Sequence, residues 1–317
     1  EGDIDYDAIS NILYHYKNIM FCKENYLNEE CWEEAFVYFR KLVKMLLLGK
    51  KLGIIINTWG EKGSGKGRGW EYISRQILGK DYEGHFKNLE ELKGRFTTLR
   101  AFKQILLVEE ASSWGGDRDL WDVLKSYATS DIMKYEDKGK TPFYINDYST
   151  IISMSNHPNA IRCEDKQARR PYAIRVSSER VGDRDYFKQL SIDMGDDLQT
   201  RPLTDTERRR AKYIAQEFTK WGMSADLTGF HPQISMPRTK DRIIGEMYAC
   251  PTYIRFLRCL LFDWRDKNDE LKCFGEIEQD VKVMDALMKF RDGDKDPLNF
   301  TDTSTLTQSA IKAEFTN

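Results

Sequence analysis

A seven-residue stretch with the pattern G-x-x-x-x-G-K carries the clearest chemical signal in this sequence. It occupies residues 60–66 and directly follows a short apolar run. Glycines let successive backbone N–H groups curl toward one point and bind phosphate oxygens, and the start of a following helix adds partial positive charge. The closing lysine supplies a full charge for the β- and γ-phosphates of a nucleotide. The stretch therefore predicts a loop that binds ATP.

The residues expected to hold the nucleotide are Gly60, Gly63, Ser64, Gly65, Lys66 and Gly67. The last of these departs from the usual pattern, in which a serine or threonine follows the lysine and ligates Mg²⁺ through its hydroxyl. With glycine there, water or a carboxylate takes that place, or turnover is slow. The alternative is a glycine-rich surface turn, but strand and helix patterns on either side favour the phosphate loop.

Two acids follow a second apolar run, residues 105–108. An apolar strand that ends in two acids is the Walker B arrangement. We expect Glu109, where aspartate is commoner, to hold Mg²⁺, and Glu110 to orient and polarise the attacking water. The alternative is that the acids cap a helix, since acids often follow strands as helix N-caps. The position of the pair, about forty residues after the phosphate loop, favours the Walker B interpretation.

Asn156 ends a third apolar run, and its amide would hydrogen-bond the γ-phosphate or the attacking water; the alternative is a simple Asn-His-Pro turn. Arg169 and Arg170 precede a fourth run. A guanidinium there would stabilise charge on the transferring phosphoryl group, in the same chain or from a neighbouring subunit. The alternative for the arginines is a surface ion pair with a nearby acid.

A segment rich in lysine, glycine and aromatic residues, 134–148, lies between the acids and Asn156. We predict a hairpin or loop there. Lys138 and Lys140 would contact the phosphates of a single-stranded nucleic acid while aromatic side chains stack on its bases. The alternative is an exposed hairpin with a solvated tip.

The elements that must position these residues alternate between strand and helix. Strands are expected at 52–57, 104–108, 150–154 and 172–176, and helices at 70–78 and 119–129. This order predicts an α/β fold in which a parallel sheet of the P-loop AAA+ class is flanked by helices. We expect an N-terminal helical segment at 1–50, the ATPase core at 51–182, a helical C-terminal region at 183–290 and a weakly structured tail at 291–317.

Composition restricts the class of protein further. The 317 residues carry a net charge of −2, so any nucleic-acid surface must be local. Six cysteines lack the spacing of a zinc site or a disulfide framework, which indicates a reducing, intracellular compartment. No apolar run approaches membrane-spanning length, and we expect no membrane association. The opening residues lack Met and a signal peptide, so we expect a piece excised from a longer protein.

Taken in order, these motifs resemble the superfamily 3 helicases of the AAA+ class, most closely the primase-helicases of phages, mobile elements and large DNA viruses, including the poxvirus type. The resemblance spans roughly residues 35–260. Beyond the phosphate loop and the acids, the similar segments are Glu-Glu-Leu-Lys-Gly-Arg-Phe at 90–96, Glu-Asp-Lys-Gly at 136–139, Ile-Ile-Ser-Met-Ser-Asn at 151–156, Arg-Arg-Pro-Tyr at 169–172 and Met-Pro-Arg-Thr-Lys at 236–240. The departures, Gly67 and Glu109, both fall on the metal side of the site.

The resemblance implies an ATP-dependent replicative DNA helicase that forms a ring, usually hexameric, in the host cytoplasm or at a viral replication site. ATP with Mg²⁺ would lie between subunits, with Arg169 or Arg170 reaching the neighbour's γ-phosphate. Lys138 and Lys140 would line the channel and move single-stranded DNA, and a primase domain or partner would accompany the motor. Two alternatives stay open: a nucleotide-gated assembly or loader module with weak hydrolysis, and a P-loop kinase.

Overall fold

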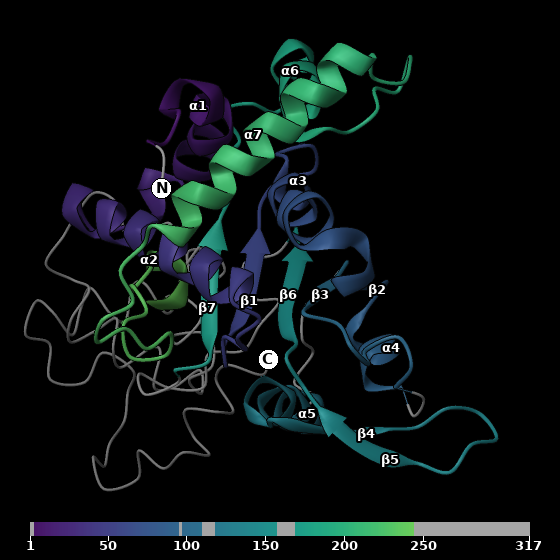
Figure 1. Cartoon of the computed structure of the whole chain (residues 1–317). Coiled ribbons are helices and arrows are strands. Elements are labelled where there is room, and N and C mark those ends of the chain that lie inside the picture. The colour runs from purple at the N-terminus through teal and green to yellow at the C-terminus, as the bar shows by residue number, and fades with distance from the viewer. Residues whose placement is uncertain (1–2, 95–96, 110–117, 157–168, 244–317) are drawn as a thin grey trace, which may run out of the picture. The chain divides into compact units, whose positions relative to one another are not determined.

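The centre of the molecule is a sheet of five parallel strands in the order β2-β3-β6-β1-β7 (Figure 1). In this computed structural model the described residues are 3–94, 97–109, 118–156 and 169–243, all within one compact unit. The strands are β1 (Ile55–Trp59), β2 (Glu83–Phe86), β3 (Ile105–Val108), β6 (Thr150–Ser155) and β7 (Pro171–Arg175). The predicted α/β fold with a parallel sheet flanked by helices is confirmed.

Side chains of successive strand residues point to opposite faces of the sheet. On both faces they pack into an apolar cluster. On β3, Ile105 and Leu107 join the larger of two apolar clusters, whereas Leu106 and Val108 join the smaller. Every β3 residue is buried, as expected for a strand covered on both faces. Because side-chain direction alternates along the strand, one continuous apolar run contributes to both clusters.

Helices from residues 6–71 and 184–223 cover the larger cluster, and two helices between residues 89 and 129 cover the smaller. The first group comprises α1 (Tyr6–Tyr14), α2 (Glu29–Leu47), α3 (Lys66–Glu71), α6 (Arg184–Met194) and α7 (Asp205–Met223). The second comprises α4 (Leu89–Lys93) and α5 (Arg118–Thr129). A capping box of Thr204 and Glu207 fixes the start of α7.

Four short non-α helical segments lie beside the helices of the first group. A π-helix, His15–Met20, extends α1, and a second, Tyr72–Gly79, extends α3. Single 3₁₀ turns lie at Lys23–Asn25 and Lys80–Tyr82. The helix predicted at 70–78 is therefore part of one helical run that begins at the phosphate loop.

Two strand predictions needed correction. The strand expected at 52–57 runs from Ile55 to Trp59, because Gly53 has a left-handed φ of 69° that breaks the extended chain before it. Strand β2 was not predicted, since its four residues, Glu-Gly-His-Phe, lack an apolar run. It lies at the sheet edge, where only one neighbour and one covered face are required.

The predicted hairpin is present as β4 (Ile132–Tyr135) and β5 (Phe143–Asn146), an antiparallel pair separate from the main sheet. Figure 1 shows it extending from the sheet as an arm. Thr97 pins it, since the hydroxyl donates to the Lys134 carbonyl (2.9 Å) and accepts from the Glu136 N–H (2.8 Å). A two-stranded ribbon is marginally stable alone, so these bonds substitute for a third strand.

A buried lysine anchors the base of the hairpin to the sheet. Lys51, just ahead of β1, contacts the Asp147 carboxylate (2.9 Å) and the Ser130 carbonyl (2.6 Å), one on each side of the hairpin. Burial lowers the pKa of Lys51, and the Asp147 charge opposes that shift. The hairpin base is thereby fixed at the amino ends of β1 and β6.

The predicted division at residue 183 stays a prediction. The part of the helical C-terminal region after residue 243 and the tail at 291–317 lie outside the described residues. Within the described ranges, no helix has the length and apolar character needed to cross a membrane.

Candidate nucleotide-binding site

The glycine-rich loop lies at the carboxyl edge of the sheet, between the end of β1 and the start of α3. Gly63 and Gly65 have φ values of 84° and 85°, the left-handed region that favours glycine. A Cβ on Gly65 would lie 2.7 Å from the Phe187 ring and 3.0 Å from His15, so space also excludes a side chain there. The loop therefore has the curled backbone that binding of phosphate oxygens requires.

Lys66 and Asn156 meet at this edge. The Lys66 Nζ donates to the Asn156 Oδ1 (2.5 Å) and to the carbonyls of Gly60 (3.0 Å) and Glu61 (3.3 Å). Partial burial lowers the pKa of Lys66. Adjacent strands β1 and β6 create the contact, because Trp59 is paired with Ser155: Asn156 directly follows β6, and the loop that follows β1 carries Lys66 back to the same edge. Two groups ninety residues apart in sequence thus share one point.

Two features of the loop bear on whether it fits a nucleotide and a metal ion. The Ser64 hydroxyl is buried and has no hydrogen-bond partner in the described part of the chain, so it retains bonding capacity within the loop. A Cβ on Gly67 would lie 3.5 Å from the Met154 sulfur, which is ordinary contact. The missing hydroxyl at position 67 is therefore not explained by lack of space.

Glu109 lies at the same edge, directly after β3. Its N–H donates to the Phe86 carbonyl (2.8 Å), and its Oε1 lies 3.0 Å from the His85 Nε2. The Glu109 side chain is 52% exposed, which leaves it open to a further ligand. Strand β6 separates β1 from β3, so two strand spacings, about 10 Å, lie between the phosphate loop and this carboxylate.

The metal site is incomplete among the described residues. Glu110 lies outside them, and within them no group of three or more His, Cys, Asp or Glu side chains could hold a metal ion. Mg²⁺ does not need such a cage, because it commonly binds through one or two carboxylates, waters and substrate phosphates. Glu109 is a carboxylate that an ion bound in this way could use.

Arg169 and Arg170 lie at the opposite edge of the sheet. The Ile55 N–H donates to the Arg170 carbonyl (2.7 Å), which places Arg170 at the amino end of β1. Gly60 is five residues further along that strand, about 16 Å away at the usual rise. Arg169 is exposed and Arg170 half-buried. Neither guanidinium can therefore reach the phosphate loop of its own chain.

The predicted nucleic-acid residues lie on the hairpin turn. Lys138 and Lys140 are exposed, and the Lys140 Nζ lies 2.7 Å from the Asp137 carboxylate. Since Lys51 fixes the hairpin base at the amino ends of β1 and β6, the hairpin and the arginine pair share one edge. Lys66, Asn156 and Glu109 occupy the other.

A cluster beside the phosphate loop was not predicted. The Trp59 indole donates to the Asp241 carboxylate (2.7 Å), and Arg175 pairs with the same carboxylate, its guanidinium 4.9 Å from the Trp59 ring centre. Burial raises the pKa of Asp241. The cluster ties the segment around Asp241 to the ends of β1 and β7. Each member is unremarkable in sequence, and only the fold joins them.

His85 was also missed, because the strand that carries it was missed. No local pattern marks a histidine on a short polar edge strand as a neighbour of Glu109. The register supplies the contact, since His85 is paired with Leu107, two residues before the acid.

Residues 58–170 match the family described as "Family of unknown function (DUF5906)". Curated proteins gave no match. Two apo structures of the NrS-1 C-terminal region align with TM-scores of 0.56 at 12% and 13% identity, covering 93% of this chain and 68% of theirs. A third apo structure of the same region has a TM-score of 0.54 at 13% identity, covering 92% of this chain and 64% of that one. At such identity the likeness shows a shared fold.

Proposed function

We propose that this chain is an ATP-hydrolysing motor that works between subunits of a ring and moves single-stranded DNA in replication. The observation that carries the proposal is the meeting of Lys66 and Asn156 at the end of a curled glycine loop. Lys66 would hold the β- and γ-phosphates, and Asn156 would sense the γ-phosphate or attacking water. The fold shared with the NrS-1 C-terminal region, together with the motif order, supports a viral or mobile-element replication module.

Magnesium would enter with the nucleotide. Glu109 offers one oxygen, its other oxygen being held near His85, and Glu110 would polarise the attacking water. Bound Mg²⁺ would neutralise charge developing on the phosphates. We expect Glu110→Gln to retain ATP binding and lose hydrolysis. If Glu109→Gln alone removed the base, the two roles would be reversed.

The separation of the arginines from the phosphate loop supports assembly. The arginine backbone lies about 16 Å from the loop of its own chain, so these side chains would act on a neighbour's nucleotide. We therefore propose a ring, in the expected case a hexamer, with a site at each interface.

Subunit mixing tests this arrangement. Chains with Lys66→Ala and chains with both Arg169→Ala and Arg170→Ala would each be inactive alone. Mixed, they would form interfaces at which an intact loop faces intact arginines, and hydrolysis would return. Activity that stays absent in mixtures, with assembly of mixed rings verified by micrographs, would contradict action between subunits.

A second function is supported by Gly67. Without a hydroxyl for Mg²⁺, the chain would bind ATP and turn over slowly, as a nucleotide-gated assembly or loader module does. Equilibrium binding of ATP combined with negligible turnover, unchanged by single-stranded DNA, would favour this module. Hydrolysis stimulated by DNA would favour the motor.

A further inference from the structure

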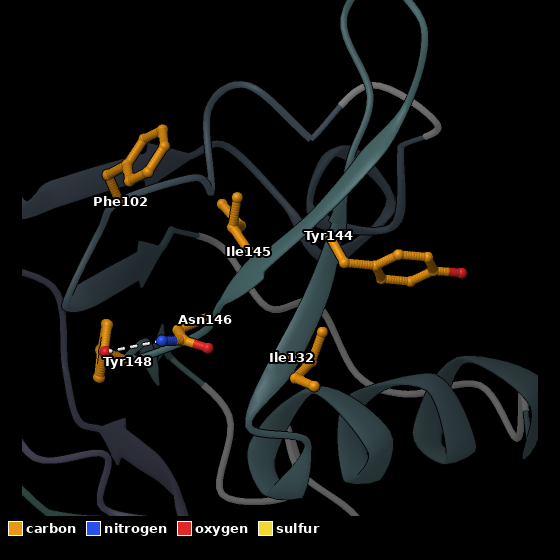
Figure 2. A pocket seen from close by; sticks show the side chains of 6 residues that line it. All are labelled: Phe102, Ile132, Tyr144, Ile145, Asn146 and Tyr148. Atoms are coloured by element: carbon orange, nitrogen blue, oxygen red, sulfur yellow. Dashed lines mark hydrogen bonds between the residues drawn. The ribbon is translucent and has the colours of Figure 1, made fainter.

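An aromatic hollow of about 450 Å³ lies at the base of the hairpin (Figure 2). Its lining residues are Phe102, Ile132, Tyr144, Ile145, Asn146 and Tyr148. Four of them are large apolar or aromatic side chains with more than half of their surface in solvent: Phe102 (68%), Ile132 (55%), Tyr144 (75%) and Tyr148 (51%). Such clustering of exposed rings marks a binding surface rather than an ordinary exterior.

Phe102 reaches the hollow at a cost in backbone strain. Its φ is 61°, and it is the one non-glycine residue with positive φ in the described ranges. A bulky side chain in this region is disfavoured and persists where function or packing requires it. The ring is mostly exposed and lies 6.2 Å from the Tyr135 ring, on the face of the ribbon opposite Tyr144. The conformation presents the ring beside the hairpin.

Strand pairing places different chemical groups on one face of the ribbon. Ile132 is opposite Asn146, and Lys134 is opposite Tyr144. Residues directly opposite each other share a face, as do residues two apart. One face therefore carries an ammonium group, a phenol ring, an amide and an aliphatic side chain. Figure 2 shows the Tyr144 ring directed outward from β5, away from the hairpin backbone.

The side-chain amide of Asn146 uses its nitrogen in a hydrogen bond, whereas its oxygen is directed away from that bond. Its Nδ2 donates to the Tyr148 hydroxyl (3.2 Å), drawn as the dashed line in Figure 2, while its oxygen points the other way. That oxygen can accept from an amino or imino group of a planar ligand beside Tyr144.

The hairpin carries three lysines with exposed side chains, Lys134, Lys138 and Lys140, beside acids that are less exposed. The side chains of Lys134 and Lys140 are 52% and 67% exposed, whereas those of Glu136 and Asp147 are 10% and 2% exposed. Lys134 and Lys140 are each paired with an acid, Glu136 and Asp137, at 2.7 Å, and Lys138 is exposed at the turn. These exposed lysines suit an anionic chain running along the hairpin.

We propose that this hollow binds an unpaired base of a single-stranded nucleic acid. The base stacks on Tyr144 beside Ile132 on the same face of the ribbon, the Asn146 oxygen accepts from the base edge, and Lys134 and Lys138 face the flanking phosphates. Rings with one amide and adjacent amines form the usual base-binding set. The proposal rests on the nucleic-acid part of the proposed function and needs neither ATP turnover nor a ring.

The test compares two fluorescent 20-nucleotide probes, oligo(dT) and an abasic strand of equal length, in binding titrations without ATP. Stacking per base implies that Tyr144→Ala weakens oligo(dT) binding roughly 5- to 100-fold. Binding of the abasic strand would stay unchanged, and Tyr144→Trp would restore oligo(dT) binding. Tyr6→Ala, which removes a 54% exposed ring on α1, is the matched control and should change neither.

If Tyr144→Ala lost equal affinity for both probes, Tyr144 would act on the nucleic-acid backbone and not on a base. If its affinity for oligo(dT) were unchanged, no base would bind in the hollow. Either result overturns the proposal. Sedimentation of the same variant identifies a third outcome. Loss of self-association with intact oligo(dT) binding would make the hollow a contact between copies, which also overturns it. A wild-type chain that binds oligo(dT) through Tyr144 but never hydrolyses ATP would refute the motor and leave this inference standing.

Discussion

Restoring the missing hydroxyl at position 67 is the sharpest perturbation that the structure suggests. Gly67 is the second residue of α3, and its φ lies outside the left-handed region. An added Cβ makes only ordinary contact with the Met154 sulfur at 3.5 Å. Gly67→Ser should therefore fold, and helix propensity alone should raise the free energy of unfolding by about 0.5 kcal/mol.

The effect on metal binding should be larger than the effect on stability. A serine at this position would place a hydroxyl oxygen where related loops ligate Mg²⁺. A hydrogen bond or ligand contact to a charged group contributes about 1.5 kcal/mol or more, which corresponds to roughly a tenfold change in affinity. We expect the Mg²⁺ concentration for half-maximal ATP hydrolysis to fall about tenfold, with little change in metal-free nucleotide binding.

Gly67→Ala is the matched control, since it adds the same Cβ without the oxygen. Its free energy of unfolding should rise by about 1 kcal/mol relative to glycine. Mg²⁺ titrations of hydrolysis and of fluorescent-nucleotide binding then compare three chains. If serine and alanine gave the same Mg²⁺ midpoint, position 67 would not face the metal and the reasoning would be refuted.

Three further outcomes concern stability. Gly69→Ala should destabilise the chain by at least ~2 kcal/mol in denaturant unfolding, because its Cβ would lie 2.1 Å from the Met20 sulfur; unchanged unfolding would show that Met20 moves freely. Thr97→Val should loosen the hairpin by about 1–3 kcal/mol, seen as faster hydrogen exchange in β4 but not in β1; equal exchange rates would mean that Thr97 does not pin it. Burial lowers the pKa of His15 to about 4, so as the pH falls below about 6.5 the unfolded chain binds a proton that the folded chain does not. The free energy of unfolding should therefore fall by about 2 kcal/mol between pH 7 and 5. A His15→Phe chain that lost the same amount would contradict this cause.

Local sequence signals predicted the elements that alternate in the core. The phosphate loop, the runs that became β3 and β6, and the hairpin were all legible, because apolar runs and glycine patterns reflect purely local requirements. The predicted start of β1 was three residues too early, since the run Leu-Gly-Ile-Ile-Ile does not reveal that the chain bends at Gly53.

Contacts across the fold were beyond the sequence. The Lys66–Asn156 contact follows from the pairing of β1 with β6, although four strands lie between them in the chain. His85 beside Glu109 depends on an edge strand that lacks a pattern. Phe102 was overlooked because nothing local marks a phenylalanine with positive φ beside a hairpin.

The central claim is that the loop at residues 60–66 binds ATP for hydrolysis driven by single-stranded DNA. Steady-state hydrolysis by the wild-type chain and by Lys66→Ala, each with and without oligo(dT), tests it most directly. We predict turnover that rises when DNA is added and that Lys66→Ala abolishes along with tight ATP binding. Wild-type ATP affinity in Lys66→Ala, or turnover indifferent to DNA and to this lysine, would contradict the account.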